Sequence, residues 1–358
     1  MKRTSSISFL LPGFPGKPGG GIKVVLEYAN YFAKMGYEVH VVYPYALYFN
    51  RKSIFGKINT LMRFPFAMLK HYTARSWFKL DEAVKEHRFF SLNPLYVPKT
   101  DYYVATALET AFRLKGYDLS DKHKFYFIQG FEAWGDPEET VYESYSLGLK
   151  NIAVSNWLKN KVESSGAKCT LIRNGFDFDY FRLTEPPETR SPYVISMMYG
   201  TSAVKGSGYG LEALSMVRDR YPQLKVMMFG TPERPADMPG WIEYYRQPDR
   251  DTHNRIYNSS SIYLAPSLQE GWGLTVGEAM ICGNAIVCTD TLGFQEMVRD
   301  GKEGLIVPVR NSQALADAIL KLIDNPELRL RMANTSMHTI ASFSWEDSFR
   351  KFESLLTL

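Results

Sequence analysis

The sequence predicts an α/β protein with two Rossmann-like domains. A chain of 358 residues has room for two domains. Two series of strand and helix patterns follow one another along it, and a segment rich in proline and charge, residues 184–192, separates them. The apolar content of 45% and charged content of 22% are ordinary for a soluble globular protein. No run of about 18 apolar residues occurs, so no membrane-spanning helix is predicted.

The first series opens with a βαβ pattern. Residues 7–12 are a short apolar strand, and residues 22–35 have the apolar spacing of an amphipathic helix that ends at Gly36. Residues 38–43 form the second strand, which completes the unit. Further strands of this series are expected at 101–106, 124–129 and 151–155.

The second series repeats the alternation after residue 192. Strands are expected at 193–198, 224–229, 262–265 and 285–289, and helices at 209–220, 274–282 and 313–324. A last helix begins near Ser344.

The most informative segment contains Glu270 and Glu278, eight residues apart, at a strand-to-helix transition. Gly271 and Gly273 free the backbone between the strand and the helix. The N–H groups at a helix start point outward, and the helix dipole favours an anion there. Two carboxylates beside an anion site fit a nucleotide sugar, whose phosphates meet the N–H groups and whose hydroxyls meet the acids. The sequence therefore predicts a nucleotide-sugar site here.

This segment resembles the Glu-x7-Glu motif of the retaining glycosyltransferases of family 4, the glycosyl transferases group 1 of polysaccharide and glycolipid biosynthesis. Residues 45–100 match the family poorly. Five other segments match it in order: 152–158, 172–181, 283–290, 293–298 and 300–307. The resemblance implies the GT-B fold, in which two Rossmann-like domains face each other across a cleft. It places the acceptor-side domain at 1–185 with the C-terminal helix 344–358, and the nucleotide-sugar domain at 186–343.

The resemblance also implies roles for individual residues. Glu278 would hold the ribose hydroxyls, Glu270 would contact the transferred hexose, and Lys205 would stabilise the leaving diphosphate. The family has an arginine five residues before this lysine, where the present chain has Gly200. The other expected donor-binding residues are Gly20, Gly21, Gly271, Trp272, Gly273, Leu274 and Thr275.

Relatives in this family have a histidine that contacts the sugar, and no histidine occurs in the matching stretch here. Gln129 or Glu132 is expected to replace it at the sugar or acceptor. Each assignment has a plain structural alternative. Glu278 then only complements the helix dipole, Lys205 is a solvated lysine, and Gln129 and Glu132 pack a loop.

A basic and aromatic stretch occupies residues 48–79, and residues 39–80 contain no Asp or Glu. Apolar residues recur there at helical spacing until Pro65, which is expected to interrupt the helix. A basic amphipathic helix is typical of a membrane surface, so Lys57, Arg63 and Lys70 are candidates for contact with anionic lipid. The alternative is an ordinary solvated surface. No nucleic-acid motif accompanies these charges.

We therefore expect a cytoplasmic enzyme with peripheral contact to the inner face of the cell membrane. Three cysteines without metal-ligand spacing fit a reducing compartment. By resemblance, it transfers a hexosyl or deoxyhexosyl group with retention to a glycan or lipid-linked acceptor, as in lipopolysaccharide assembly. It would need no metal and no cofactor besides the nucleotide diphosphate sugar. Two alternatives remain, an epimerase on the same fold and a catalytically inactive glycan-binding scaffold.

Overall fold

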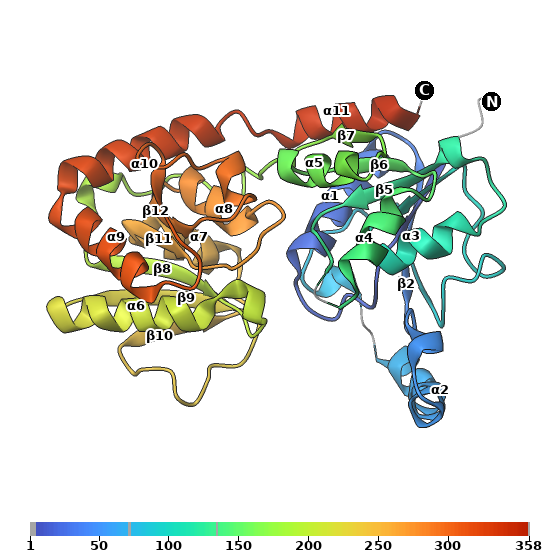
Figure 1. Ribbon diagram of the computed structural model, residues 1–358, viewed down its shortest axis with the longest axis horizontal. Coiled ribbons are helices and arrows are strands. Elements are labelled where there is room, and N and C mark those ends of the chain that lie inside the picture. Colours follow the sequence, from blue (N-terminus) through green and yellow to red (C-terminus); the bar gives the residue numbers. More distant parts are fainter. Residues whose placement is uncertain (1–4, 71–72, 134, 357–358) are drawn as a thin grey trace. The chain divides into compact units, whose positions relative to one another are not determined.

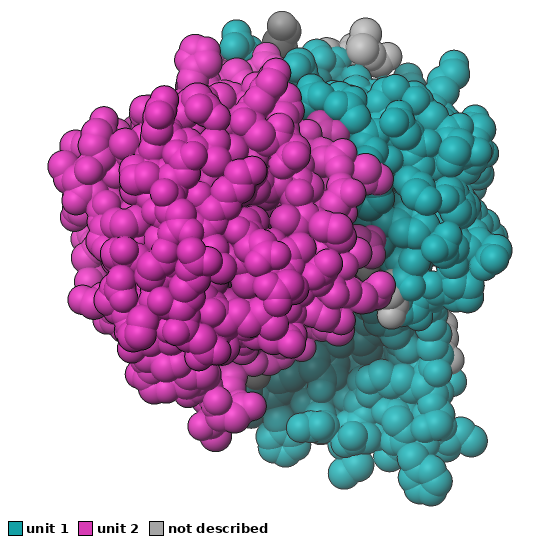
Figure 2. Space-filling view, turned by 60° about the vertical axis from the view of Figure 1, so that its left-hand side comes forward, with its two compact units in different colours: residues 1–173, 348–358 teal, residues 174–347 magenta. Residues whose placement is uncertain are grey.

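The computed structural model describes residues 5–70, 73–133 and 135–356. The chain forms two compact units, coloured separately in Figure 2. Unit 1 comprises Met1–Arg173 and Ser348–Leu358, and unit 2 comprises Asn174–Asp347. The units therefore divide earlier in the chain than the predicted boundary at residues 185–186.

The proline-rich segment 184–192 packs against the helices of unit 2. The Thr184 N–H donates to Oδ1 of Asn258 at 2.7 Å. The guanidinium of Arg190, which is buried, donates to the carbonyl oxygen of Cys282 at 2.7 Å. The segment predicted as a linker is thus part of the body of unit 2.

Unit 1 is built on a parallel sheet covered by helices (Figure 1). Its described strands follow the order β3-β2-β1-β4-β5-β6-β7. They are β1 (Ser6–Leu10), β2 (Glu38–Pro44), β3 (Lys85–Phe89), β4 (Tyr102–Ala105), β5 (Lys124–Ile128), β6 (Lys150–Ala153) and β7 (Cys169–Leu171). Its helices are α1 (Gly20–Lys34), α2 (Ile54–Leu69), α3 (Leu108–Lys115), α4 (Glu138–Tyr145), α5 (Asn156–Ser164) and the greater part of α11 (Trp345–Leu356).

Helix α11 is held in unit 1 by aromatic side chains. The ring of Phe352, which is fully buried, lies 5.1 Å from that of Tyr28 and 5.6 Å from that of Phe32. Phe349 stacks on Tyr31 at 4.6 Å. Because Tyr28, Tyr31 and Phe32 all lie on α1, the two ends of the chain close one core.

Unit 2 repeats the architecture with a parallel sheet in the order β10-β9-β8-β11-β12-β13 among the described residues. The strands are β8 (Val194–Tyr199), β9 (Lys225–Gly230), β10 (Ile242–Arg246), β11 (Ile262–Ala265), β12 (Ala285–Thr289) and β13 (Gly304–Val307). The helices are α6 (Ser207–Arg220), α7 (Arg250–Ser259), α8 (Leu274–Ile281), α9 (Ser312–Asp324) and α10 (Pro326–Ile340).

Both sheets have a point where the strand order reverses. In unit 1 the order reverses between β1 and β4, and in unit 2 between β8 and β11. The helices that follow two such strands lie on opposite faces of the sheet, and α/β proteins bind ligands at the carboxyl ends of these strands.

The strands that the sequence did not reveal, β3, β7, β10 and β13, are edge strands. In β3 and β10 polar and charged residues are mixed with apolar ones, so the apolar pattern that marks a central strand is weak. β7 and β13 are only three and four residues long, which is too short for a clear pattern. The helices α3, α4, α5, α7 and α10 were also not predicted. The expected interruption at Pro65 was wrong, because α2 continues to Leu69. Pro65 is exposed within α2, and a proline removes one backbone hydrogen bond from a helix without necessarily ending it.

Candidate functional site

Two loops meet at the strand-order reversal of unit 2. One follows β8 and the other follows β11. The Leu268 N–H of the second loop donates to the carbonyl oxygen of Val204 in the first at 2.7 Å. Gly206 has φ of +60°, and a side chain there would collide with the carbonyl oxygen of Pro266. The close approach of the loops therefore requires glycine at this position.

Lys205 and Glu270 form an ion pair where these loops touch. The Lys205 Nζ lies 2.7 Å from Oε1 of Glu270, and the Ser267 hydroxyl donates to the same oxygen at 2.8 Å. The lysine side chain is 31% exposed and the glutamate side chain 15%. The two residues predicted to act on the diphosphate and the hexose are thus in contact, and both reach solvent.

A third loop, which follows β12, packs against the backbone of Glu270. A side chain at Gly293 would collide with the backbone carbonyl of Glu270. No role was predicted for Gly293, although it lies in a segment that matches the family. Ser267, whose hydroxyl orients the Glu270 carboxylate, was not predicted as a site residue either.

Helix α8 begins beside the ion pair. Its N-cap is Gly273, which has no side chain to accept from the first N–H groups of the helix. The N–H groups of Leu274 and Thr275 at this end suit an anion. Trp272 differs from the prediction, because it is only 3% exposed and its ring packs against Phe343 at 5.6 Å. Its backbone can contact a donor, but its side chain belongs to the core.

Glu278 lies one turn inside α8 and is 5% exposed. The hydroxyl of Tyr257, which is fully buried, donates to Oε2 of Glu278 at 3.2 Å. Burial, reinforced by this carboxylate, raises the pKa of Tyr257 well above its ordinary value. Tyr257 therefore stays protonated, and its hydroxyl donates the hydrogen bond that positions Glu278, the residue predicted to bind the ribose. The sequence analysis missed this partner, which lies on α7.

Replacing Glu278 with alanine should weaken nucleotide binding at least about tenfold, because a charged acceptor contributes roughly 1.5–3 kcal/mol per hydrogen bond. Isothermal calorimetry with nucleoside diphosphates measures this. Tyr257→Phe is the matched control, since it removes the internal hydrogen bond and keeps the carboxylate. Equal losses in the two variants would show that Glu278 serves packing rather than the ligand.

The predicted residues of unit 1 also come together. Gly20 and Gly21 begin α1 and are exposed. The Gln129 Nε2, just after β5, donates to the carbonyl oxygen of Gly21 at 3.1 Å. This contact brings the glycine loop and the residue expected to replace the family histidine to one place in unit 1.

Glu132 is the acid of this region, and it accepts a hydrogen bond from the Leu108 N–H at the start of α3 at 3.0 Å. Burial raises the pKa of Glu132 to about 7; the Leu108 N–H opposes this shift, and Asp136 adds to it. The sequence analysis missed the neighbouring ion pairs, in which Arg51 contacts Asp136 and also Glu109, the latter at 2.8 Å.

The raised pKa of Glu132 predicts a pH-dependent stability. The folded protein holds this proton more tightly than the unfolded chain, so wild-type stability should fall as pH rises from about 4.5 to 7. The contribution is about 3 kcal/mol at most. Glu132→Gln should flatten the profile, as urea titrations across this range would show. Parallel wild-type and variant profiles would contradict the assignment.

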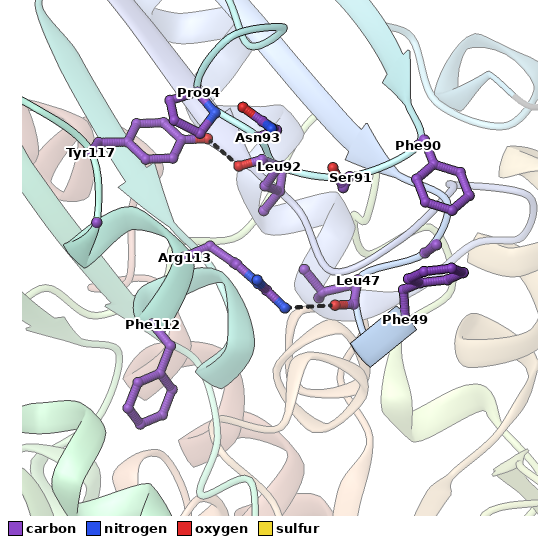
Figure 3. A pocket seen from close by; sticks show the side chains of 12 residues that line it. Leu47, Phe49, Phe90, Ser91, Leu92, Asn93, Pro94, Phe112, Arg113 and Tyr117 are labelled. Carbon is purple, nitrogen blue, oxygen red and sulfur yellow. Dashed lines mark hydrogen bonds between the residues drawn. The ribbon is translucent and has the colours of Figure 1, made fainter. Parts of the chain in front are cut away.

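Unit 1 also contains a pocket of about 450 Å³ beside α3 (Figure 3). Its walls include Phe49, Phe90 and Leu92, and the Tyr117 hydroxyl closes one side by donating to the Leu92 carbonyl at 3.0 Å. The Arg113 guanidinium extends along the pocket toward the loop after β2. The residues predicted for donor and acceptor are not part of its wall.

Comparison with known proteins finds a family model that matches most of the second unit. Residues 193–325 match the model of the family described as Glycosyl transferases group 1. A phosphatidyl-myo-inositol mannosyltransferase of Mycolicibacterium smegmatis is 26% identical over 210 residues, which cover 55% of this chain and 54% of that protein. The match therefore spans about half the length of this relative. The resemblance found in the sequence is confirmed.

Solved structures are similar over nearly the whole chain. HepE of Anabaena, in complex with UDP and glucose, has a TM-score of 0.74 at 16% identity and covers 99% of this chain and 100% of its own. Sucrose-phosphate synthase of Thermosynechococcus elongatus has a TM-score of 0.71 at 15% identity, with 99% and 98% covered. These likenesses confirm the GT-B fold class of two Rossmann-like domains.

Proposed function

Because residues 193–325 match the group 1 glycosyltransferases, we propose that the protein transfers a sugar from a nucleotide diphosphate sugar to a glycan or lipid-linked acceptor. The transferred group is a hexosyl or deoxyhexosyl group, and its anomeric configuration is retained. The observation that carries the proposal is the contact between Lys205 and Glu270 at the strand-order reversal of unit 2. This is where an α/β sheet binds its ligand.

The proposal gives each residue a separate task. Lys205 and the N–H groups at the start of α8 stabilise the negative charge of the leaving diphosphate. Glu270 holds the hexose, and Glu278 holds the ribose. Bond cleavage at the anomeric carbon and attack by the acceptor oxygen occur on one face. The departing phosphate oxygen takes the acceptor proton, so these residues position and stabilise, and neither a protein base nor a metal ion is assigned.

The class of acceptor rests on similarity. The relative from Mycolicibacterium smegmatis is named for phosphatidyl-myo-inositol, a lipid, and this supports a lipid-linked acceptor. We propose the cytoplasmic face of the membrane as the place of transfer. Glu132 and Gln129 are the residues of unit 1 assigned to the acceptor or sugar.

A panel of nucleotide diphosphate sugars tests the proposal. The correct donor should raise the melting temperature, because a ligand that binds only the folded state stabilises it. Nucleotide release that requires an acceptor would establish transfer. A converted sugar without an acceptor would instead indicate an epimerase. Donor binding without turnover would indicate an inactive scaffold, which the glycine at position 200 keeps open as an alternative.

A further inference from the structure

Helix α2 exposes its apolar side chains. Of its sixteen residues, all of which the structure describes, only Thr60 is buried. Soluble proteins rarely expose a contiguous apolar patch of this kind unless it binds a partner. Seven large apolar residues are between 50% and 86% exposed: Ile54, Phe55, Ile58, Leu61, Met62, Phe66 and Leu69.

The polar side of α2, with one aromatic ring, faces unit 1. The Thr60 hydroxyl donates to the Gly56 carbonyl at 2.7 Å and accepts from the Lys52 Nζ at 2.7 Å. The Phe64 ring lies 5.2 Å from that of Phe90. The helix is therefore fixed with its apolar side outward, opposite to the usual arrangement, and Figure 1 shows it projecting from the sheet of unit 1.

The exposed apolar residues form one continuous face. At about 100° per residue they span an arc of roughly 140°. Arg63 lies beyond one edge of this arc and Lys57 beyond the other, and Lys70 follows the helix end. No acid occurs between residues 39 and 80. An apolar face bordered by cations matches a lipid surface, where acyl chains meet the face and phosphates meet the charges.

We propose that α2 inserts its apolar face into the lipid layer of an anionic membrane and anchors unit 1 there. The helix lies in the plane of the interface, since none of the described helices, α2 included, has the length and apolar character needed to cross a bilayer. This insertion does not depend on the enzymatic reaction. Its link with a lipid-linked acceptor rests on the proposed function.

With the apolar side of α2 facing outward, the exposed apolar residues contribute more to membrane contact than the basic residues predicted from the sequence. Lys57 is only partly exposed, and its Nζ lies 6.0 Å from the centre of the Phe49 ring. Salt screens the exposed charges, whereas burial of apolar surface in lipid is not screened. The apolar face is therefore the main anchor, and Lys57, Arg63 and Lys70 add a preference for anionic lipid.

A second copy of the chain fits the face less well than lipid. Pairing of two α2 helices about a two-fold axis brings the same residues of both copies together. Arg63 and Lys57 would then meet like charges, and this part of the sequence offers no acid to compensate them.

Vesicle co-sedimentation of the full chain tests the proposal. Vesicles of phosphatidylcholine alone are compared with vesicles that also contain phosphatidylglycerol, at low and high salt. The wild-type protein should bind the anionic vesicles more tightly and should keep most of this binding at high salt. The triple variant Phe55→Ser, Phe66→Ser, Leu69→Ser should bind at least about tenfold more weakly. Met35→Ser combined with Leu292→Ser is the control, because both residues are about half exposed but lie outside α2.

Three outcomes would overturn the proposal. One is a wild-type protein that stays in solution with both vesicles, and another is a triple variant that binds like wild type. The third is a concentration-dependent dimer in analytical ultracentrifugation that the triple variant abolishes, which would identify a second copy as the occupant. Thermal stabilisation by the nucleotide sugar should be equal in wild type and variant. If no nucleotide sugar binds the wild-type protein, the proposed function is refuted, but the proposed membrane insertion of α2 is not.

Discussion

A Lys205→Met variant is expected to lose about a hundredfold to a thousandfold in turnover, the scale found when one group that stabilises developing negative charge is removed. Methionine keeps the length of the side chain and removes its charge. The loss should be visible in initial rates at saturating donor. Binding of the nucleoside diphosphate should weaken as well, while the monophosphate should bind as before, because Lys205 is assigned to the diphosphate.

Lys225→Met provides the matched control for this experiment. Lys225 is exposed and begins β9, so it lies at the amino ends of the parallel strands, away from the carboxyl ends that carry the site. Its replacement should leave rates and affinities unchanged. Wild-type turnover in the Lys205→Met variant would show that other groups neutralise the leaving diphosphate.

A Glu270→Gln variant should turn over about a hundredfold more slowly, because the carboxylate is assigned to the transferred sugar. Affinity for the free nucleoside diphosphate should stay unchanged or become tighter. The reason is the ion pair of 2.7 Å, in which Glu270 competes with the diphosphate for Lys205. Calorimetry and steady-state rates measure the two quantities separately.

Glu327→Gln, at an exposed acid of α10, controls for the loss of one negative charge. Collapse of nucleotide affinity with normal turnover at saturating donor would mean that Glu270 and Glu278 have exchanged roles. In the double variant Lys205→Met, Glu270→Gln the gain in nucleotide affinity expected from Glu270→Gln should be smaller than in the wild-type background, because that gain comes from releasing Lys205 and residues in direct contact are not additive.

The sequence by itself predicted the central strands and the loop that contains Glu270. Strands such as β11 and β12 are buried on both faces, so they are continuous apolar runs that need no tertiary information to recognise. The glycines around Glu270 are equally local signals, since they mark a turn between a strand and a helix. The family resemblance then suggested roles for Glu270, Glu278 and Lys205, whose chemistry alone is also compatible with purely structural roles.

Contacts between distant parts of the chain were decided by the tertiary structure alone. Lys205 and Glu270 are 65 residues apart, and only the reversal of strand order brings their loops together. Arg190 joins the expected linker to unit 2 by donating to backbone carbonyls. Such contacts cannot be predicted from the sequence, because every residue has a backbone carbonyl. For α2, helical spacing revealed an apolar stripe but not its direction, because periodicity is the same whether a stripe faces a core or faces outward. Burial of Thr60 and packing of the Phe64 ring on Phe90 turned that stripe away from the protein.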